Sequence, residues 1–363
     1  MDRTRLLWPF FGFVFLAASV CGVSACSDDS SSSDLDGGDD AGTDGDTDGD
    51  TDGDADTDAD TDTDTDTDTD TDTDADAGPD GGAGEDETIV ALFGGGEFYS
   101  GDAGVIDELK SSGFNTIFLW SLHVGANGAT YLNDAELTDT NGDYVGDTDW
   151  PARLADLRAE PSSVDRIEIS VGSGGVPDWQ KIRNLVTAQG TDSDSVLYKA
   201  FETLKTITGA DAVDYDNEDD FDVNTAVAVS EMLADLGYAV TLCPYEQPFA
   251  NPTYWSDLYD GVEASRPGAI DRVYLQVYGG GWSNDPADWY GSFGELQVTA
   301  GMWSLHDTDC AAGTNPEQVQ AQMSTWKPDV AGGFIFIYGD IKKCESTGYT
   351  TGDYAAAISD GLE

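Results

Sequence analysis

The stretch DAVDYDNE, residues 211–218, carries carboxylates at every second position, namely Asp214, Asp216 and Glu218. Val213 and Tyr215, which separate these acids, favour β-strands. Side chains two positions apart in a strand point the same way, so the three acids should share one face at spacings of about 6.5–7 Å. Like charges this close cannot all ionise freely, so at least one acid should hold its proton toward neutral pH.

The surrounding residues place this strand at a junction between two helices. The preceding TITGA (Thr206–Ala210) reads as a helix end with Gly209 near the C-cap, and a new helical pattern begins at Val223. Strand-to-helix junctions are where barrel enzymes carry their chemistry. A protonated carboxyl beside an ionised one is what cleavage of a glycosidic bond requires. The alternative for such an acidic run is a solvated surface loop.

DAVDYDNE resembles DGxDxDxE, the strand-four signature of glycoside hydrolase family 18, which comprises chitinases and endo-β-N-acetylglucosaminidases. All four acids match, and Ala212 replaces the family glycine. The resemblance implies that Glu218 is the general acid and later the base. It implies that Asp216 orients and stabilises an oxazolinium-like intermediate, and that Asp214 shares a proton with Asp216. The substrate's 2-acetamido oxygen, and no enzyme group, would be the nucleophile.

Three other strand ends bear on the resemblance. SVGSGG, beginning at Ser170, resembles the SxGG segment of the family, in which this serine supports the strand-four acids. Tyr278 matches the family tyrosine that binds the acetamido group, although Gln276 and Gly279 depart from the family Met-x-Tyr-Asp and favour the endo-type enzymes. The last strand, ending FIFIY, lacks the usual floor tryptophan, for which Tyr338 or Phe336 could substitute.

Strand and helix patterns alternate from residue 87 onward. Eight short apolar runs fall at Thr88–Phe93, Asn115–Ser121, Arg166–Val171, Ala212–Asp216, Ala239–Leu242, Ile270–Tyr278, Leu296–Gly301 and Gly333–Tyr338. Helical patterns fall at Ala103–Ser112, Trp150–Ala159, Asp178–Ala188, Ser195–Thr208, Asn224–Leu236, Thr253–Ala264, Ala287–Phe293, Pro316–Trp326 and Tyr354–Leu362. This alternation predicts an α/β fold, a (β/α)8 TIM barrel. A doubly wound open sheet is the alternative, but no GxGxxG follows the first strand.

An insertion follows the second strand. Asn141-Gly142 lies between the strand formers Tyr131-Leu132 and Tyr144-Val145, which predicts a β-hairpin. On a barrel, this hairpin would stand on the C-terminal rim and wall one side of a cleft. Aromatic rings at the rim stack on sugar faces, and we expect Tyr99, Trp282 and Trp303 to contact sugar, with a core role as the alternative.

The chain divides into three parts. Residues 1–25 have the layout of a signal peptide, with Arg3 and Arg5 before an apolar run, and VSAC at residues 23–26 resembles a bacterial lipobox with Cys26 as the lipidated residue. An ordinary secretory signal or an uncleaved anchor is the alternative. Residues 26–86 form an Asp/Thr-rich linker that cannot bury a core and is expected to be a disordered tether. Residues 87–363 form the barrel.

The linker also suggests calcium binding, because residues 44–49 (DGDTDG) fit the start of an EF-hand loop. Ala55 stands where the loop needs its final glutamate, so a plain tether is preferred. The formal charge of −57 argues against nucleic-acid binding. Only His123 and His306 are present and CxxC is absent, so neither a metal site nor a cofactor is expected.

The remaining cysteines suit an extracytoplasmic protein. Cys310 and Cys344 fall in neighbouring loops after the seventh and eighth strands and predict a disulfide. Cys243, in the fifth strand, is expected to be buried and free. The resulting hypothesis is a monomeric lipoprotein of the bacterial cell surface or outer membrane that hydrolyses a β-1,4-linked N-acetylglucosamine glycan. The alternatives are a family 18-like barrel that binds carbohydrate without turnover, and a structural surface lipoprotein.

Overall fold

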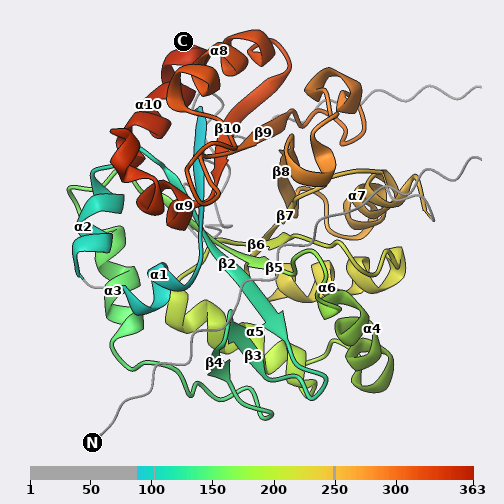
Figure 1. Cartoon of the computed structure of the whole chain (residues 1–363). Coiled ribbons are helices and arrows are strands. Elements are labelled where there is room, and N and C mark those ends of the chain that lie inside the picture. Colours follow the sequence, from blue (N-terminus) through green and yellow to red (C-terminus); the bar gives the residue numbers. More distant parts are fainter. Residues whose placement is uncertain (1–87, 102, 248–250) are drawn as a thin grey trace, which may run out of the picture. The chain divides into compact units, whose positions relative to one another are not determined.

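The computed structural model describes residues 88–101, 103–247 and 251–363. Within them, eight parallel strands close into a barrel (Figure 1). In barrel order these strands are β1 (Ile89–Gly94), β2 (Thr116–Val124), β5 (Arg166–Val171), β6 (Ala212–Tyr215), β7 (Ala239–Leu242), β8 (Ile270–Gln276), β9 (Val298–Trp303) and β10 (Val330–Phe336). The barrel closes because β1 pairs in parallel with both β10 and β2. The predicted (β/α)8 barrel is therefore confirmed.

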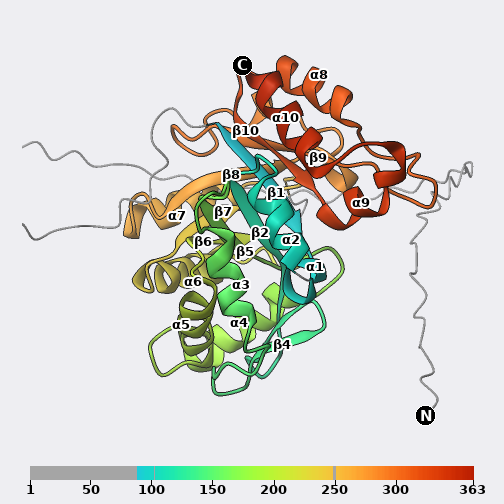
Figure 2. The ribbon, with the colours of Figure 1, turned by 90° about the vertical axis from the view of Figure 1, so that its left-hand side faces the viewer.

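Helices surround the strands (Figures 1 and 2). The longer helices are α2 (Ala103–Lys110), α3 (Trp150–Leu157), α4 (Asp178–Gln189), α5 (Val196–Thr208), α6 (Val223–Asp235), α7 (Tyr254–Ser265), α8 (Pro316–Trp326) and α10 (Thr351–Leu362). The shorter ones are α1 (Gly96–Ser100), α9 (Tyr338–Lys343) and the 3-10 turns η1 (Gly279–Gly281), η2 (Pro286–Trp289) and η3 (Glu345–Thr347). None of the helices in the described part is long and apolar enough to cross a membrane.

One predicted helix and one predicted strand differ from the structure. The helix expected at Ala287–Phe293 is only the short turn η2. Gly291 and Gly294 adopt positive φ angles, so the helical conformation does not continue past it. The last strand ends at Phe336, two residues earlier than expected, and Tyr338 begins α9 instead. This second difference changes where the Tyr338 side chain lies.

The helices on either side of β6 have strong end signals. The side chain of Ser195 accepts a hydrogen bond from Tyr198 N at the start of α5, and Gly209 ends that helix at φ 62°. The Asp222 side chain caps α6 by accepting from Thr225 N. Each N-cap of this kind contributes about 1 kcal/mol. Together they fix where the chain enters and leaves the four-residue strand that carries the acids.

The barrel has an outer and an inner set of buried side chains. The outer set fills the layer between strands and helices and includes Val213 and Tyr215 of β6. Aromatic rings dominate the inner set, in which Phe93 stacks on Phe118 with ring centroids 4.0 Å apart, and Phe118 meets Tyr274 edge-on at 4.7 Å. Full burial of such a side chain contributes about 1.5–3 kcal/mol. The inner face of β6 is left to its carboxylates.

The insertion after β2 contains a β-hairpin, as predicted, but its turn does not lie at Asn141-Gly142. Strands β3 (Thr130–Leu132) and β4 (Ala135–Thr138) pair antiparallel around a turn at residues 133–134. The Asn141-Gly142 turn closes only a single bridge, Thr138 with Tyr144. It packs on α5, where Thr203 Oγ1 donates to Gly142 O at 2.7 Å. The insertion therefore braces α5, and none of its residues lines the cavity described below.

Candidate active site

Strand β6 directs its first acid into the barrel. Val213 and Tyr215 face the outer layer, where the Tyr215 hydroxyl is 2.9 Å from Ser230 Oγ. Asp214 therefore points inward and is fully buried. Ser170 Oγ donates to its Oδ2 at 2.7 Å, and Thr241 Oγ1 lies 3.0 Å from its Oδ1. Burial, followed by the nearby Glu168 charge, raises the pKa of Asp214 well above its ordinary value.

Asp216 lies at the inner end of a cavity. Trp120 Nε1 donates to its Oδ2 and Gln276 Nε2 to its Oδ1, both at 3.0 Å. Burial and the neighbouring Glu218 raise the pKa of Asp216 well above its ordinary value, and the two carboxyl groups share a side-chain hydrogen bond. Both oxygens of Asp216 are thus held in place from β2, β8 and Glu218.

Glu218 is half-buried against the loop that follows β5. Burial raises its pKa, as do the charges of Glu246 and Asp219, while its hydrogen bond with Asp216 opposes the shift. A side chain at Gly174 would come within 2.9 Å of the Glu218 carboxylate, and one at Gly172 within 2.4 Å of the Asp216 carbonyl oxygen. The glycines after Ser170 therefore make room for the acids.

Between the two acids, Asn217 fixes the chain. Its side chain is fully buried, and its Nδ2 donates to Tyr254 OH at 2.8 Å and to Asp220 O at 2.7 Å. Because Asn217 points into the outer layer, Asp216 and Glu218 are turned to the same side. The strand-like alternation predicted for the acids thus continues past the last residue of β6.

The acids open into a cavity of about 380 Å³. Its walls comprise Phe93, Trp120, Ser173, Gly174, Asp216, Glu218, Cys243, Tyr245, Gln276, Tyr278, Gly279, Gly280, Trp303 and Phe336. These residues come from the carboxyl ends of β1, β2, β5, β6, β7, β8, β9 and β10, or from the loops that follow them. Aromatic walls with a few convergent polar groups are typical of a ligand site.

An aromatic cluster centred on Phe336 forms one wall. Its ring stacks on Tyr278 at 5.4 Å between centroids, and meets Trp120 at 5.1 Å and Trp303 at 5.3 Å edge-on. Burial, with the charges of Asp216 and Glu218 among the smaller causes, raises the pKa of Tyr278 well above its ordinary value, so its hydroxyl stays protonated. Phe336, the last residue of β10, thus joins three other aromatic rings into one wall.

The Trp303 ring is fixed by contacts with two neighbouring residues. Its Nε1 donates to Asp340 Oδ2 at 2.9 Å, and its ring stacks on His306 with centroids 4.0 Å apart. A disulfide between Cys310 and Cys344 joins the loop that carries His306 to the end of α9. Cys243 is buried and unpaired, just after β7, and lines the cavity. The loop after β9 therefore fixes the orientation of the Trp303 ring.

The predicted site residues are not all brought together. Asp216, Glu218, Tyr278 and Trp303 line the cavity. Asp214 and Ser170 lie beneath it, fully buried, so Ser170 supports an acid and does not face a ligand. Trp282 is 76% exposed, beside the Gly279–Gly281 turn.

Tyr99 and Tyr338 lie elsewhere and need correction as sugar contacts. The Tyr99 ring packs on Trp150 of α3, and its hydroxyl accepts from Asp147 N at 2.7 Å. Tyr338 is buried against Phe98, and its hydroxyl donates to Glu108 at 3.1 Å. Neither lines the cavity. The lipidation site Cys26 and the linker lie outside the described residues.

Two residues that hold Asp216 are not predicted from the sequence. Trp120 is not singled out there, and Gln276 appears only as a departure from the family motif. Trp120 follows Phe118 by two residues in a strand, so the alternation already placed both on the inner face. The same alternation marks Arg166, Glu168 and Ser170 as polar residues facing the barrel interior.

Comparison with known proteins supports the fold. No family model matches the sequence, and no curated protein is significantly similar to it. Among solved structures, the chain is similar to the family 18 chitinase ChiB of Flavobacterium johnsoniae, with 14% identity over 76% of this chain and 94% of that one and a TM-score of 0.50. It is also similar to the catalytic domain of a hyperthermophilic chitinase from Pyrococcus furiosus, with 9% identity over 76% of this chain and 95% of that one and a TM-score of 0.51. A third similar structure is the Group IV chitinase of Ostrinia furnacalis, with 9% identity over 76% of this chain and 100% of that one and a TM-score of 0.50. The fold is therefore like that of family 18 glycoside hydrolases.

Proposed function

We propose that the barrel is a glycoside hydrolase that cleaves β-1,4-linked N-acetylglucosamine, in chitin-like chains or N-glycan cores. The observation that carries this proposal is the pairing of Asp216 with Glu218 at the inner end of an aromatic-walled cavity. The family 18-like fold supports it. The strongly acidic composition favours a substrate without negative charge, since a polyanion would be repelled.

Glu218 is the proton donor in this proposal. Burial raises its pKa, so near neutral pH the fraction of Glu218 that is protonated is larger than for an exposed glutamate. The proton passes to the glycosidic oxygen as the bond between that oxygen and the anomeric carbon breaks. Glu218, now ionised, later accepts a proton from the water that attacks the same carbon.

The nucleophile is the acetamido oxygen of the substrate. It forms a bond to the anomeric carbon as the leaving group departs, which gives a cationic oxazolinium ring. Asp216, held by Trp120 and Gln276, is placed to orient the acetamido group and to balance the positive charge. Tyr278, protonated in the cavity wall, offers a hydroxyl to the same group. The configuration at the anomeric carbon is inverted twice, so the product has the same anomeric configuration as the substrate.

The aromatic wall supplies the binding surface. Trp303 and Phe336 line the cavity, and aromatic rings bury the apolar C–H faces of sugars. The floor tryptophan of the family is replaced by Phe336, whose neighbours Trp120 and Trp303 provide the indole rings. The wall therefore retains its aromatic character with a different arrangement of residues.

The proposal extends to the location of the enzyme. A lipid on Cys26 would hold the chain at the bacterial surface, and the Asp/Thr-rich linker would hold the barrel away from the membrane. Metabolic labelling with a palmitate analogue tests the anchor. The parent should carry the label, and Cys26→Ser should not.

Hydrolysis of defined substrates tests the activity. The full chain should release the fluorophore from a di-N-acetylchitobioside, or cleave the chitobiose core of an N-glycoprotein. Proton NMR of the first product should show the β-anomer. Binding of chitooligosaccharide without cleavage of either substrate would favour the carbohydrate-binding alternative. The α-anomer as first product would contradict the substrate-assisted mechanism.

A further inference from the structure

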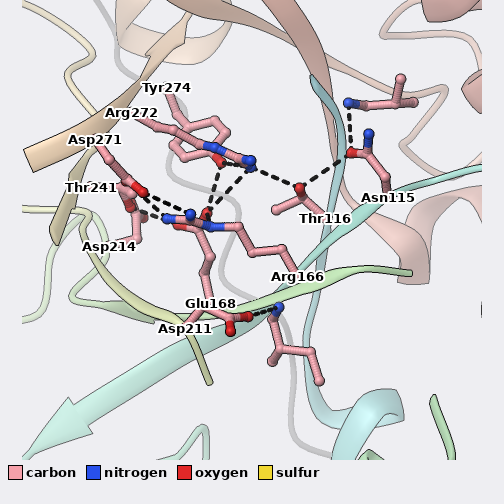
Figure 3. A network of polar contacts seen from close by, with 12 residues as sticks. Asn115, Thr116, Arg166, Glu168, Asp211, Asp214, Thr241, Asp271, Arg272 and Tyr274 are labelled. Carbon is pink, nitrogen blue, oxygen red and sulfur yellow. Dashed lines mark hydrogen bonds and ion pairs between the residues drawn. The ribbon is translucent and has the colours of Figure 1, made fainter. Parts of the chain in front are cut away.

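The barrel interior beneath the acids holds a buried ion cluster (Figure 3). Glu168 of β5 is fully buried and accepts from Arg166 Nε at 2.7 Å and from Tyr274 OH at 2.8 Å. Arg272 of β8 lies 3.9 Å from the same carboxylate. Arg166 also makes a two-pronged contact with Asp271, at 2.7 and 2.9 Å. The cavity above does not reach this cluster.

One hydroxyl joins the cluster to the first of the three acids. Thr241 Oγ1 of β7 lies 2.7 Å from Glu168 Oε2 and 3.0 Å from Asp214 Oδ1 (Figure 3). A threonine hydroxyl has a single proton and can donate to only one of these two carboxyl groups. The other contact needs a proton from the carboxyl group itself. Glu168 already faces two guanidinium groups, so the extra proton belongs on Asp214.

The charges of the cluster lead to the same assignment. Two guanidinium groups, Arg166 and Arg272, are matched by two carboxylates, Glu168 and Asp271. Burial raises the pKa of Asp271, and its pairing with Arg166 opposes this shift. The two-pronged contact with the Arg166 guanidinium is the geometry of a carboxylate, so Asp271 is counted as one. An ionised Asp214 would add a negative charge without a buried cation to match it, and such a charge is costly in a protein interior.

We propose that Glu168 is a positioning residue that keeps Asp214 protonated, through the Thr241 hydroxyl and through the charge balance of the buried cluster. The titratable and charged groups that face this pair are Arg166 on β5, Asp216 after β6, Cys243 after β7, and Asp271, Arg272, Tyr274 and Tyr278 on or after β8. Arg166 and Arg272 are the cations among them.

The consequence for catalysis rests on the proposed function, whereas the location of the proton does not. Asp216 has to carry negative charge when the oxazolinium ring forms. A neutral Asp214 two residues away removes one of the two neighbouring negative charges, those of Asp214 and Glu218, that would oppose ionisation of Asp216. Glu168 would thereby act on the reaction through Asp214 without touching the substrate.

Infrared spectroscopy of the full chain locates the proton. Exposed carboxyl groups are ionised at neutral pH, so the C=O band of protonated carboxyl groups comes from buried ones. Subtracting the spectrum of Asp214→Asn isolates the Asp214 contribution. The same subtraction is then repeated in a Glu168→Gln background. This substitution removes one negative charge from the cluster. Asp214 should then ionise to balance the two arginines, and the pH at which its band disappears should fall by about 1–3 units.

A second variant predicts the opposite shift. Arg272→Gln leaves one cation against two carboxylates, so Asp214 should hold its proton to a higher pH than in the parent. This variant also carries the test if Glu168→Gln does not fold. The matched control is Glu108→Gln, because Glu108 likewise accepts from a tyrosine, a threonine and a basic residue, but lies among the outer helices. It should leave the Asp214 band unchanged.

The proposal is overturned if the parent shows no protonated carboxyl that Asp214→Asn removes. It is also overturned if the Asp214 band of Glu168→Gln disappears at the same pH as in the parent, or if Arg272→Gln lowers the pH at which the band disappears. A chain that cleaves no glycan but shows the predicted band shifts would refute the proposed function and leave the protonation of Asp214 intact.

Discussion

The indole Nε1 of Trp120 donates a 3.0 Å hydrogen bond to Asp216 Oδ2, across 96 positions of sequence. This contact ties β2 to the end of β6, and together with the hydrogen bond from Gln276 it holds the Asp216 carboxyl group next to Glu218. The same indole forms part of the cavity wall. One residue therefore fixes a carboxylate and shapes the space in which a sugar would lie.

Trp303 and Trp282 should differ in their effect on substrate binding. Trp303→Ala removes a ring held in the wall by Asp340 and His306, and we expect KM to rise about tenfold, equivalent to about 1.4 kcal/mol. Trp282→Ala removes a mostly exposed ring outside the wall and should change KM far less. Steady-state kinetics on a chitooligosaccharide series measure both. Equal effects would contradict the assignment of the wall.

Asp214→Asn should change how stability depends on pH. Burial and Glu168 raise the pKa of Asp214, so the folded chain binds a proton that the unfolded chain loses above about pH 4. The free energy of unfolding therefore falls as pH rises from there toward the raised pKa. The variant should lose this contribution, which is at most about 1.4 kcal/mol per pH unit. Urea titrations across this range measure the slope, and an unchanged slope would refute the assignment.

The disulfide should stabilise the loop that carries His306. Replacing Cys310 and Cys344 together by serine removes a cross-link over 34 residues and should lower the free energy of unfolding by about 2–4 kcal/mol. The ring stack between His306 and Trp303 should also loosen, so KM should rise. Urea unfolding and steady-state kinetics check the two effects. Cys243→Ala, which breaks no cross-link, is the control for the unfolding measurement only, because Cys243 lines the cavity and its loss could change KM.

The barrel and its acids could be predicted because both follow from the period of two in strands. Val213 and Tyr215 face outward and Asp214 inward, as their alternation requires. Tyr338 could not be placed in this way. The strand ends at Phe336, and a change from strand to helix turns Tyr338 toward Phe98, which no local pattern reveals.

Half of the buried ion cluster can be read from the sequence of β5. Arg166, Glu168 and Ser170 alternate with Ile167 and Ile169, so three polar residues face the inside of a barrel. Their partners Asp271 and Arg272 lie more than a hundred positions away, and only the closed barrel brings them together. Tyr99 was misplaced because an aromatic residue after a strand packs equally well on a helix, here on Trp150.

The central claim is tested most directly by the turnover of Glu218→Gln on a fluorogenic di-N-acetylchitobioside or an N-glycoprotein, whichever the parent cleaves. Glutamine keeps the shape of Glu218 and cannot give up a proton, so the variant should fold and bind substrate but lose nearly all turnover. Glu202→Gln, an exposed change on α5, should retain parental activity. Turnover of Glu218→Gln at a tenth of the parental rate or more would contradict the account.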